Sequence, residues 1–150
     1  MKLLKIYSWI AGSKNDWLRP FQQKENEDLY SQANDFWSNL ESSSVLIVLI
    51  FVVLGISLAA YYYKPYNDVA GRHYTIKHWI FWLLGVFILT LLVTLGVEYL
   101  AVPPKLDGAQ ILEIKIALGN AIYASFIYFI TSIVWCNFGP TNACRIFKFK

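Results

Sequence analysis

Three long stretches of the chain contain no charged residue. They run over residues 42–63, 79–97 and 116–144, and each is dominated by aliphatic and aromatic side chains. A helix needs about 20 residues to cross the ~30 Å hydrocarbon layer of a bilayer, at ~1.5 Å per residue. A helix of a soluble protein needs a polar face towards water, and these stretches offer none. The pattern therefore predicts three transmembrane helices.

Aromatic and helix-breaking residues mark the ends of these helices. Tyrosine or tryptophan residues stand near the ends of each stretch, as expected of side chains at the headgroup level. A proline follows the end of each predicted helix and would interrupt its helical hydrogen bonding, at Pro65, Pro103 and Pro140. We predict an all-α integral membrane protein with spans at about 44–63, 78–101 and 116–135, within a transmembrane domain at 44–138.

The segment before the first span, residues 1–43, is polar. Within it, five apolar residues recur at steps of three and four, which places them on one helical face: Leu29, Ala33, Phe36, Trp37 and Leu40. Such an amphipathic helix could lie on the membrane or dock to a partner protein. It could equally be a solvated helix that continues into the first span. The spacing fits both alternatives.

Composition agrees with a lipid environment. The chain is 57% apolar and 15% charged, whereas a soluble domain averages about 25% charged residues. The net charge of +3 comes from scattered lysines and arginines, so we expect a lipid bilayer as partner and no nucleic acid. The apolar run Ile6–Ala11 is too short for a signal peptide, and we expect the N-terminus to belong to the mature protein.

The orientation of the chain is only weakly indicated. Three lysines or arginines lie in loop 64–77 and three in the basic tail at 139–150, on the same side of the membrane. The positive-inside rule then favours a cytoplasmic C-terminus in a bacterial inner membrane, although basic residues throughout the N-terminal segment reduce this bias. Cys136 and Cys144 could close a disulfide in an oxidising compartment, or stay two unpaired thiols.

Glu98 is the acidic residue that falls within a predicted span. An intramembrane acid is a candidate for a proton path or an ion site. However, Glu98 lies about one turn from Pro103, and we expect its carboxyl group to reach water at the interface. No second acid is expected beside it. Asn120, near the start of the third span, is expected to bond to a neighbouring helix.

The sequence contains no pattern that indicates catalysis. His73 and His78 are five residues apart, whereas metal ligands on one helical face prefer spacings of three or four. A phosphate-binding loop, a zincin motif and a nucleophile elbow are all missing. We therefore expect neither an enzyme nor a bound metal or cofactor.

Small residues at helical spacing indicate faces where helices approach closely. The third span has Ala117, Ala121 and Ser125 at four-residue steps, and the first has Gly55 and Ala59. For the first span, packing within one chain is a sufficient explanation. For the third span, contact with another subunit or a copy of the same chain is almost as strong an alternative. Threonines of the second span could add interhelical hydrogen bonds.

Three functions fit these features. The first is a small non-catalytic membrane subunit, acting as an anchor or assembly component of a larger membrane complex such as a secretion or injection apparatus. The second is an oligomeric pore-forming effector, or the immunity protein that blocks one, which would need a polar stripe along a span. The third is a minor channel or transporter subunit. We favour the first, because the spans carry so little charge.

Overall fold

The computed structural model describes residues 3–23, 26–69, 76–101, 105–139, 141 and 147, and the regular elements among them are helical. The N-terminal elements are the 3-10 turn η1 (Leu3–Tyr7), α1 (Ser8–Ala11), α2 (Lys14–Gln22) and α3 (Glu27–Ser42). The long helices are α4 (Ser44–Tyr61), followed by the π-helical turn η2 (Tyr62–Tyr66), α5 (Ile76–Ala101) and α6 (Ala109–Phe138). Three helical segments are long and apolar enough to cross a membrane, which confirms the predicted fold class.

All three segments extend beyond the predicted spans, α5 by only two residues at its start. Helix α4 and η2 together continue to Tyr66, because Pro65 is accommodated in the wider π-helical turn. Helix α6 starts at Ala109 instead of near residue 116, directly after Gly108, whose φ of +84° is a left-handed conformation that glycine adopts freely. The earlier start places Glu113, which the sequence pattern assigned to a loop, inside a helix.

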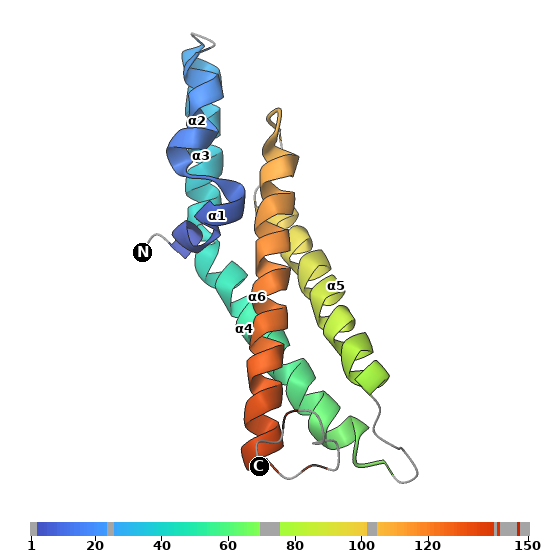
Figure 1. Cartoon of the computed structure of the whole chain (residues 1–150). Coiled ribbons are helices and arrows are strands. Elements are labelled where there is room, and N and C mark those ends of the chain that lie inside the picture. The colour runs from blue at the N-terminus through green and yellow to red at the C-terminus, as the bar shows by residue number, and fades with distance from the viewer. Residues whose placement is uncertain are drawn as a thin grey trace.

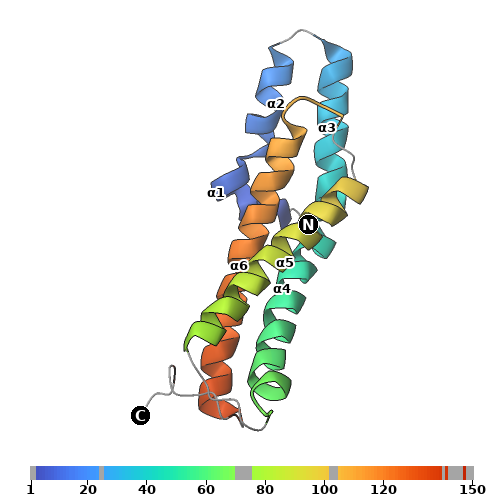
Figure 2. The ribbon, with the colours of Figure 1, turned by 90° about the vertical axis from the view of Figure 1, so that its right-hand side faces the viewer.

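Helix α6 is the centre of the membrane bundle. Both α4 and α5 pack along it, and α5 crosses the other two at an angle (Figures 1 and 2). Helices α4 and α5 each bury only a narrow strip of residues, whereas α6 buries residues along its whole length. Most of the outer surface of α4 and α5 consists of exposed aliphatic side chains, as expected of helices that face lipid.

The polar N-terminal segment folds into a helical hairpin, α2–α3, that rises beyond the end of the bundle (Figures 1 and 2). Its own small core contains Leu18, Phe21 and Ala33. The indole N–H of Trp17 donates a hydrogen bond to the carbonyl oxygen of Ala33, at 3.0 Å. Helix α3 passes into α4 with one residue, Ser43, between them, so the hairpin continues directly into the first span.

Side chains cap both helices of the hairpin. The Ser13 hydroxyl accepts from the Asp16 backbone N–H at 3.3 Å, and the Asp16 carboxylate accepts from the Ser13 N–H at 2.8 Å. These bonds from Ser13 hold the pKa of the Asp16 carboxyl below its usual value. Asn26 accepts from the backbone N–H groups of Asp28 and Leu29. Local sequence therefore determines where these helices start.

The apolar side of α3 is covered by the chain itself. Phe36, Trp37 and Leu40 are buried in a cluster to which η1 and α6 contribute, through Leu4, Tyr7, Leu112 and Ile116. The face that the sequence offered to a membrane surface or a partner is thus used for internal packing. Of the two alternatives, the structure matches a helix that continues into the first span.

Helices α4 and α6 approach each other closely at Gly55. A Cβ atom added there would lie 2.8 Å from Cγ2 of Ile127 and 2.9 Å from the carbonyl oxygen of Ala124. The second contact is with backbone, which cannot move aside without separating α4 from α6. Gly96 on the outer face of α5 differs, because a Cβ atom there would meet nothing within 4 Å.

We therefore predict opposite outcomes for two glycine-to-alanine substitutions. Gly55→Ala should lower the free energy of unfolding in detergent by ~1–3 kcal/mol, since it overpacks the α4–α6 contact. Gly96→Ala should leave it unchanged or raise it, because alanine has the higher helix propensity. Thermal unfolding of the two purified variants measures the difference. Equal effects would contradict this packing.

Candidate functional site

The side chain of Asn120 is the hub of a buried polar cluster at the hairpin end of the bundle. It is fully buried in α6. Its Oδ1 accepts a hydrogen bond from the Tyr7 hydroxyl at 2.6 Å. Its Nδ2 donates to Oγ1 of Thr94 at 2.7 Å and to the carbonyl oxygen of Ile47 at 3.0 Å. One amide therefore links η1, α4 and α5 to α6, and the expectation that Asn120 bonds to a neighbouring helix is confirmed.

Residues around Tyr7 hold the N-terminal turn η1 against α6. Gly119 makes room for it, since a Cβ atom there would lie 2.9 Å from Cδ1 of Tyr7. One turn along α6, the Tyr123 hydroxyl donates to the carbonyl oxygen of Ile6 at 2.8 Å. The same hydroxyl accepts from the indole N–H of Trp9 at 2.8 Å. The N-terminal turn is thus fixed to the membrane helix by both shape and hydrogen bonds.

Tyr7 keeps its proton at ordinary pH. Burial raises the pKa of its hydroxyl well above the usual value, and the neighbouring Glu98 raises it further. The phenol therefore stays a donor to Asn120 over the whole physiological range.

Glu98 lies one turn beyond Thr94 on the inner side of α5. We expected this carboxyl group to reach water at the interface, but its side chain has no exposed surface. Neither of its oxygens has a hydrogen-bond partner within the described residues. Glu98 is buried because the N-terminal segment folds over this end of the bundle. The hydropathy pattern of α5 alone does not show that this segment covers the helix end.

Glu113 on α6 is a second buried acid at the same end of the bundle as Glu98, and its side chain is 4% exposed. The hydrogen bond between Asn120 and Thr94 sets the register of α5 and α6. From that bond towards the α5–α6 connection, Glu98 lies one turn beyond Thr94 and Glu113 two turns before Asn120. Among the described residues, Oε1 of Glu113 also has no hydrogen-bond partner. We had not expected a second acid beside Glu98. The signal was present, since Glu113 precedes Ile116 and Asn120 by three and seven residues on the same helical face.

Among the described residues, no lysine or arginine is buried beside this acidic pair. Lys105 and Lys115, which are close to it in sequence, and Lys5 of η1 are exposed at the surface. Helix α4, which packs on the other side of Asn120, carries no charged residue. The surroundings of the two carboxyl groups are therefore hydroxyl, amide and apolar groups.

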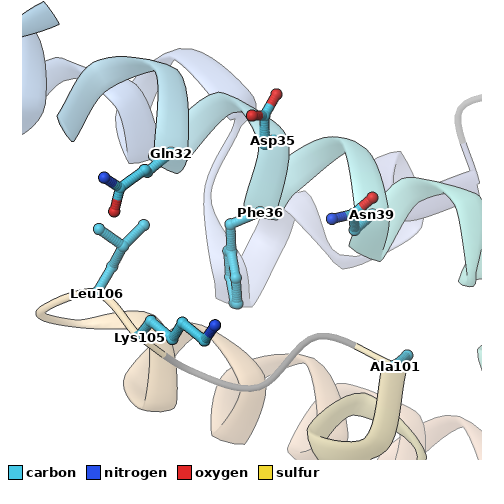
Figure 3. Close-up of a pocket in the computed structure, with 7 residues that line it drawn as sticks. All are labelled: Gln32, Asp35, Phe36, Asn39, Ala101, Lys105 and Leu106. Carbon is cyan, nitrogen blue, oxygen red and sulfur yellow. The ribbon is translucent and has the colours of Figure 1, made fainter. Parts of the chain in front are cut away.

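A pocket of about 260 Å³ lies between α3 and the connection from α5 to α6 (Figure 3). Ala101, one turn after Glu98, is one of its lining residues. The rest of the lining comes from one side of α3 and from the start of the α5–α6 turn: Gln32, Asp35, Phe36, Asn39, Lys105 and Leu106. The pocket brings a polar surface to within about one helical turn of the buried acid.

The small residues expected at helix contacts face the interior of this chain. Gly55, Ala59, Ala117 and Ala121 are all buried between its own helices. Ser125 is partly buried, and its hydroxyl donates to the carbonyl oxygen of Ala121 on its own helix at 2.9 Å. The third-span set is therefore occupied by intramolecular packing.

Cys136 and His78 lie at the opposite end of the bundle. Cys136 is buried, and its thiol is 3.8 Å from the hydroxyl of Tyr63. Cys144 lies outside the described residues, so a disulfide between the two cysteines stays a prediction. His78 is exposed, and His73 also lies outside the described residues.

Within the described ranges, no three His, Cys, Asp or Glu side chains gather as a metal centre would require. Comparisons of the chain with protein-family models, with curated proteins and with solved structures found no match. The acidic pair and the hub at Asn120 form the most distinctive site that the geometry presents.

We predict that Asn120→Leu destabilises the protein far more than Ser125→Ala. The leucine leaves the hydroxyl groups of Tyr7 and Thr94 buried without their partner, at a cost of roughly 1–3 kcal/mol. Ser125→Ala removes a bond within one helix and should change stability by less than about 0.5 kcal/mol. Thermal unfolding in detergent gives both values. Similar losses would contradict the role of Asn120 as the hub.

Proposed function

We propose that this protein is a small non-catalytic membrane subunit that anchors or assembles a larger membrane complex. The observation that supports this most is the rigid connection between the bundle and the α2–α3 hairpin. Helix α3 passes into α4 with a single residue between them, and η1 is fixed to α6 through Tyr7 and Asn120. Such a joint holds a two-helix projection at a constant position beyond the bundle.

Helix α3 of the hairpin offers exposed polar positions for a partner. They include three acidic residues, Glu27, Asp28 and Asp35, together with Gln32. Its apolar side is already buried, so recognition would use polar contacts outside the membrane. Electrostatic complementarity of this kind chiefly determines partner choice and the rate of association.

The outer face of α5 offers a second surface, within the membrane. A Cβ atom added at Gly85 or Gly96 would meet nothing within 4 Å, and exposed Leu89 and Leu92 lie between them. Glycines on an outer face allow the backbone of another transmembrane helix to approach closely. This face could receive other subunits, including copies of the same chain.

The alternatives draw less support from the geometry. A pore-forming effector, or its immunity protein, would need polar residues on an outer face after assembly, but Thr90, Thr94 and Ser132 point into the chain's own bundle. A channel or transporter subunit is the second candidate, and the buried pair Glu98 and Glu113 is the observation that favours it.

We further propose that the C-terminus is cytoplasmic and that the hairpin lies on the opposite side of a bacterial inner membrane. Lys64 and Lys77 flank the loop at the far end of the bundle, as the positive-inside rule requires for this orientation. The hairpin would then meet a periplasmic partner or the periplasmic part of another subunit.

One labelling experiment tests both the docking and the orientation. Gln32→Cys is introduced on the exposed side of α3, with both native cysteines replaced by alanine. A membrane-impermeant thiol reagent that carries a photo-crosslinker should label it in intact cells, after removal of any outer envelope. Illumination should then give an adduct of one defined mass.

Asp68→Cys, exposed at the opposite end of the bundle, is the matched control. It should react only after the membrane is opened, and it should give no such adduct. Labelled Gln32→Cys without any protein adduct would contradict the anchor proposal. Labelling of Asp68→Cys instead of Gln32→Cys in intact cells would reverse the orientation.

A further inference from the structure

We propose that Glu98 and Glu113 form a buried binding site for a small monovalent cation, either a proton or an alkali metal ion, held between their two carboxyl groups. This site does not depend on the anchor function proposed above. It lies where α5 and α6 meet the N-terminal turn η1.

Burial is the first step of the inference. Glu98 has no exposed surface and Glu113 is 4% exposed, so neither carboxyl group is solvated from outside. Moving an ionised carboxylate out of water is very costly unless an opposite charge or hydrogen bonds compensate it. Two neighbouring carboxylates add their mutual repulsion to that cost. A monovalent cation shared between them replaces this repulsion with attraction to both carboxylates and reduces the buried net charge from −2 to −1.

The second step is the lack of any other compensation. Both oxygens of Glu98 and one oxygen of Glu113 have no hydrogen-bond partner within the described residues. The two hydroxyl groups at this end of the bundle bond to Asn120, since Thr94 accepts from it and Tyr7 donates to it. Asn120 uses both of its donated bonds on Thr94 and Ile47. The carboxyl oxygens are therefore the groups that a ligand would meet.

The third step is the charge of the surroundings. Tyr7 of η1 and Thr94, one turn before Glu98, both bond to Asn120, so Tyr7 lies at the same end of the bundle as the two acids. Helix α4 brings no charged residue. On α3 the acids on the polar side, such as Asp35, are exposed, and Lys105 of the α5–α6 connection is exposed as well. Among the described residues no lysine or arginine is buried, so the charged groups buried at this site are the two acids, which favours a cation.

The donor set favours a monovalent ion. Ca²⁺ takes six to eight oxygen ligands and Mg²⁺ about six in a strict octahedron, whereas two carboxyl groups supply at most four oxygens. Mg²⁺ also gives up its water reluctantly, and this site is closed to solvent. A proton or an alkali metal ion needs fewer ligands. The pocket that Ala101 lines reaches α5 one helical turn from Glu98.

The test is ligand-dependent stability of the purified full-length protein in detergent. Melting temperature is measured with sodium, potassium or choline at equal ionic strength and fixed pH, and then over a pH series in choline. The variants are Glu98→Gln and Glu113→Gln, which keep the shape of the side chain. Glu27→Gln, at an exposed position of α3, is the control for the loss of one acid.

Two results support the proposal and identify the cation. If it is an alkali metal ion, sodium or potassium at about ten times its Kd should raise the melting temperature by ~3–5 °C over choline. If it is a proton, the three salts should give the same melting temperature. The melting temperature of the wild-type protein should then fall as pH rises, by ~3–5 °C per pH unit for each proton that unfolding releases. In either case, this dependence of the melting temperature on the salt or on pH should disappear in both glutamine variants and persist in Glu27→Gln.

The proposal is overturned if the wild-type protein shows neither dependence, or if both glutamine variants keep it. A second measurement needs no variant, in case one does not fold. A hydrophobic carbodiimide, which modifies protonated buried carboxyl groups, is applied to the wild-type protein and mapped by mass spectrometry. Modification of Glu98 or Glu113 that sodium or high pH prevents supports the site. Modification that neither condition changes, or none at all, contradicts it.

Discussion

The side-chain amide of Asn120 is the interaction on which the rest of this structure depends. It reaches three elements from a fourth, through Tyr7, Thr94 and the backbone of Ile47. In a bilayer, apolar surface gains little by leaving lipid, so packing and interhelical hydrogen bonds must determine which faces meet. A buried amide that is fully bonded gives this bundle one defined arrangement, and close packing at Gly55 and Gly119 completes it.

The same interaction explains how polar and membrane parts become one unit. Because Tyr7 is tied to Asn120, η1 and α1 lie across the end of the bundle and α3 packs its apolar side on them. This arrangement covers Glu98 and Glu113, which would otherwise stand near water at the helix ends. The two acids are therefore buried only when the N-terminal segment folds over the end of the bundle. Binding of a cation between them would then be coupled to the packing of that segment on the bundle.

Local features of the sequence predicted the three spans and the amphipathic helix α3, but not how the N-terminal segment folds over the end of the bundle. The uncharged stretches gave the three spans, and the three-to-four spacing from Ala33 to Leu40 gave the buried side of α3. Caps such as Ser13 and Asp16 are likewise visible in the sequence. The burial of Glu98 was missed, because it depends on Tyr7, more than a hundred residues from its partner Asn120. Glu113 was missed because a charged residue near a span was taken as the sign of a loop, although its spacing from Asn120 placed it on the inner face.

A double-mutant cycle between Tyr7→Phe and Asn120→Leu tests the central role of this amide most directly. The free energy of unfolding is measured in the same detergent for the wild-type protein, both single variants and the double variant. If the two side chains hold the N-terminal turn on α6 as described, the losses are non-additive, with a coupling energy of about 0.5–1.5 kcal/mol. Losses that simply add would show that Tyr7 and Asn120 act independently, and would contradict this account of how the protein is held together.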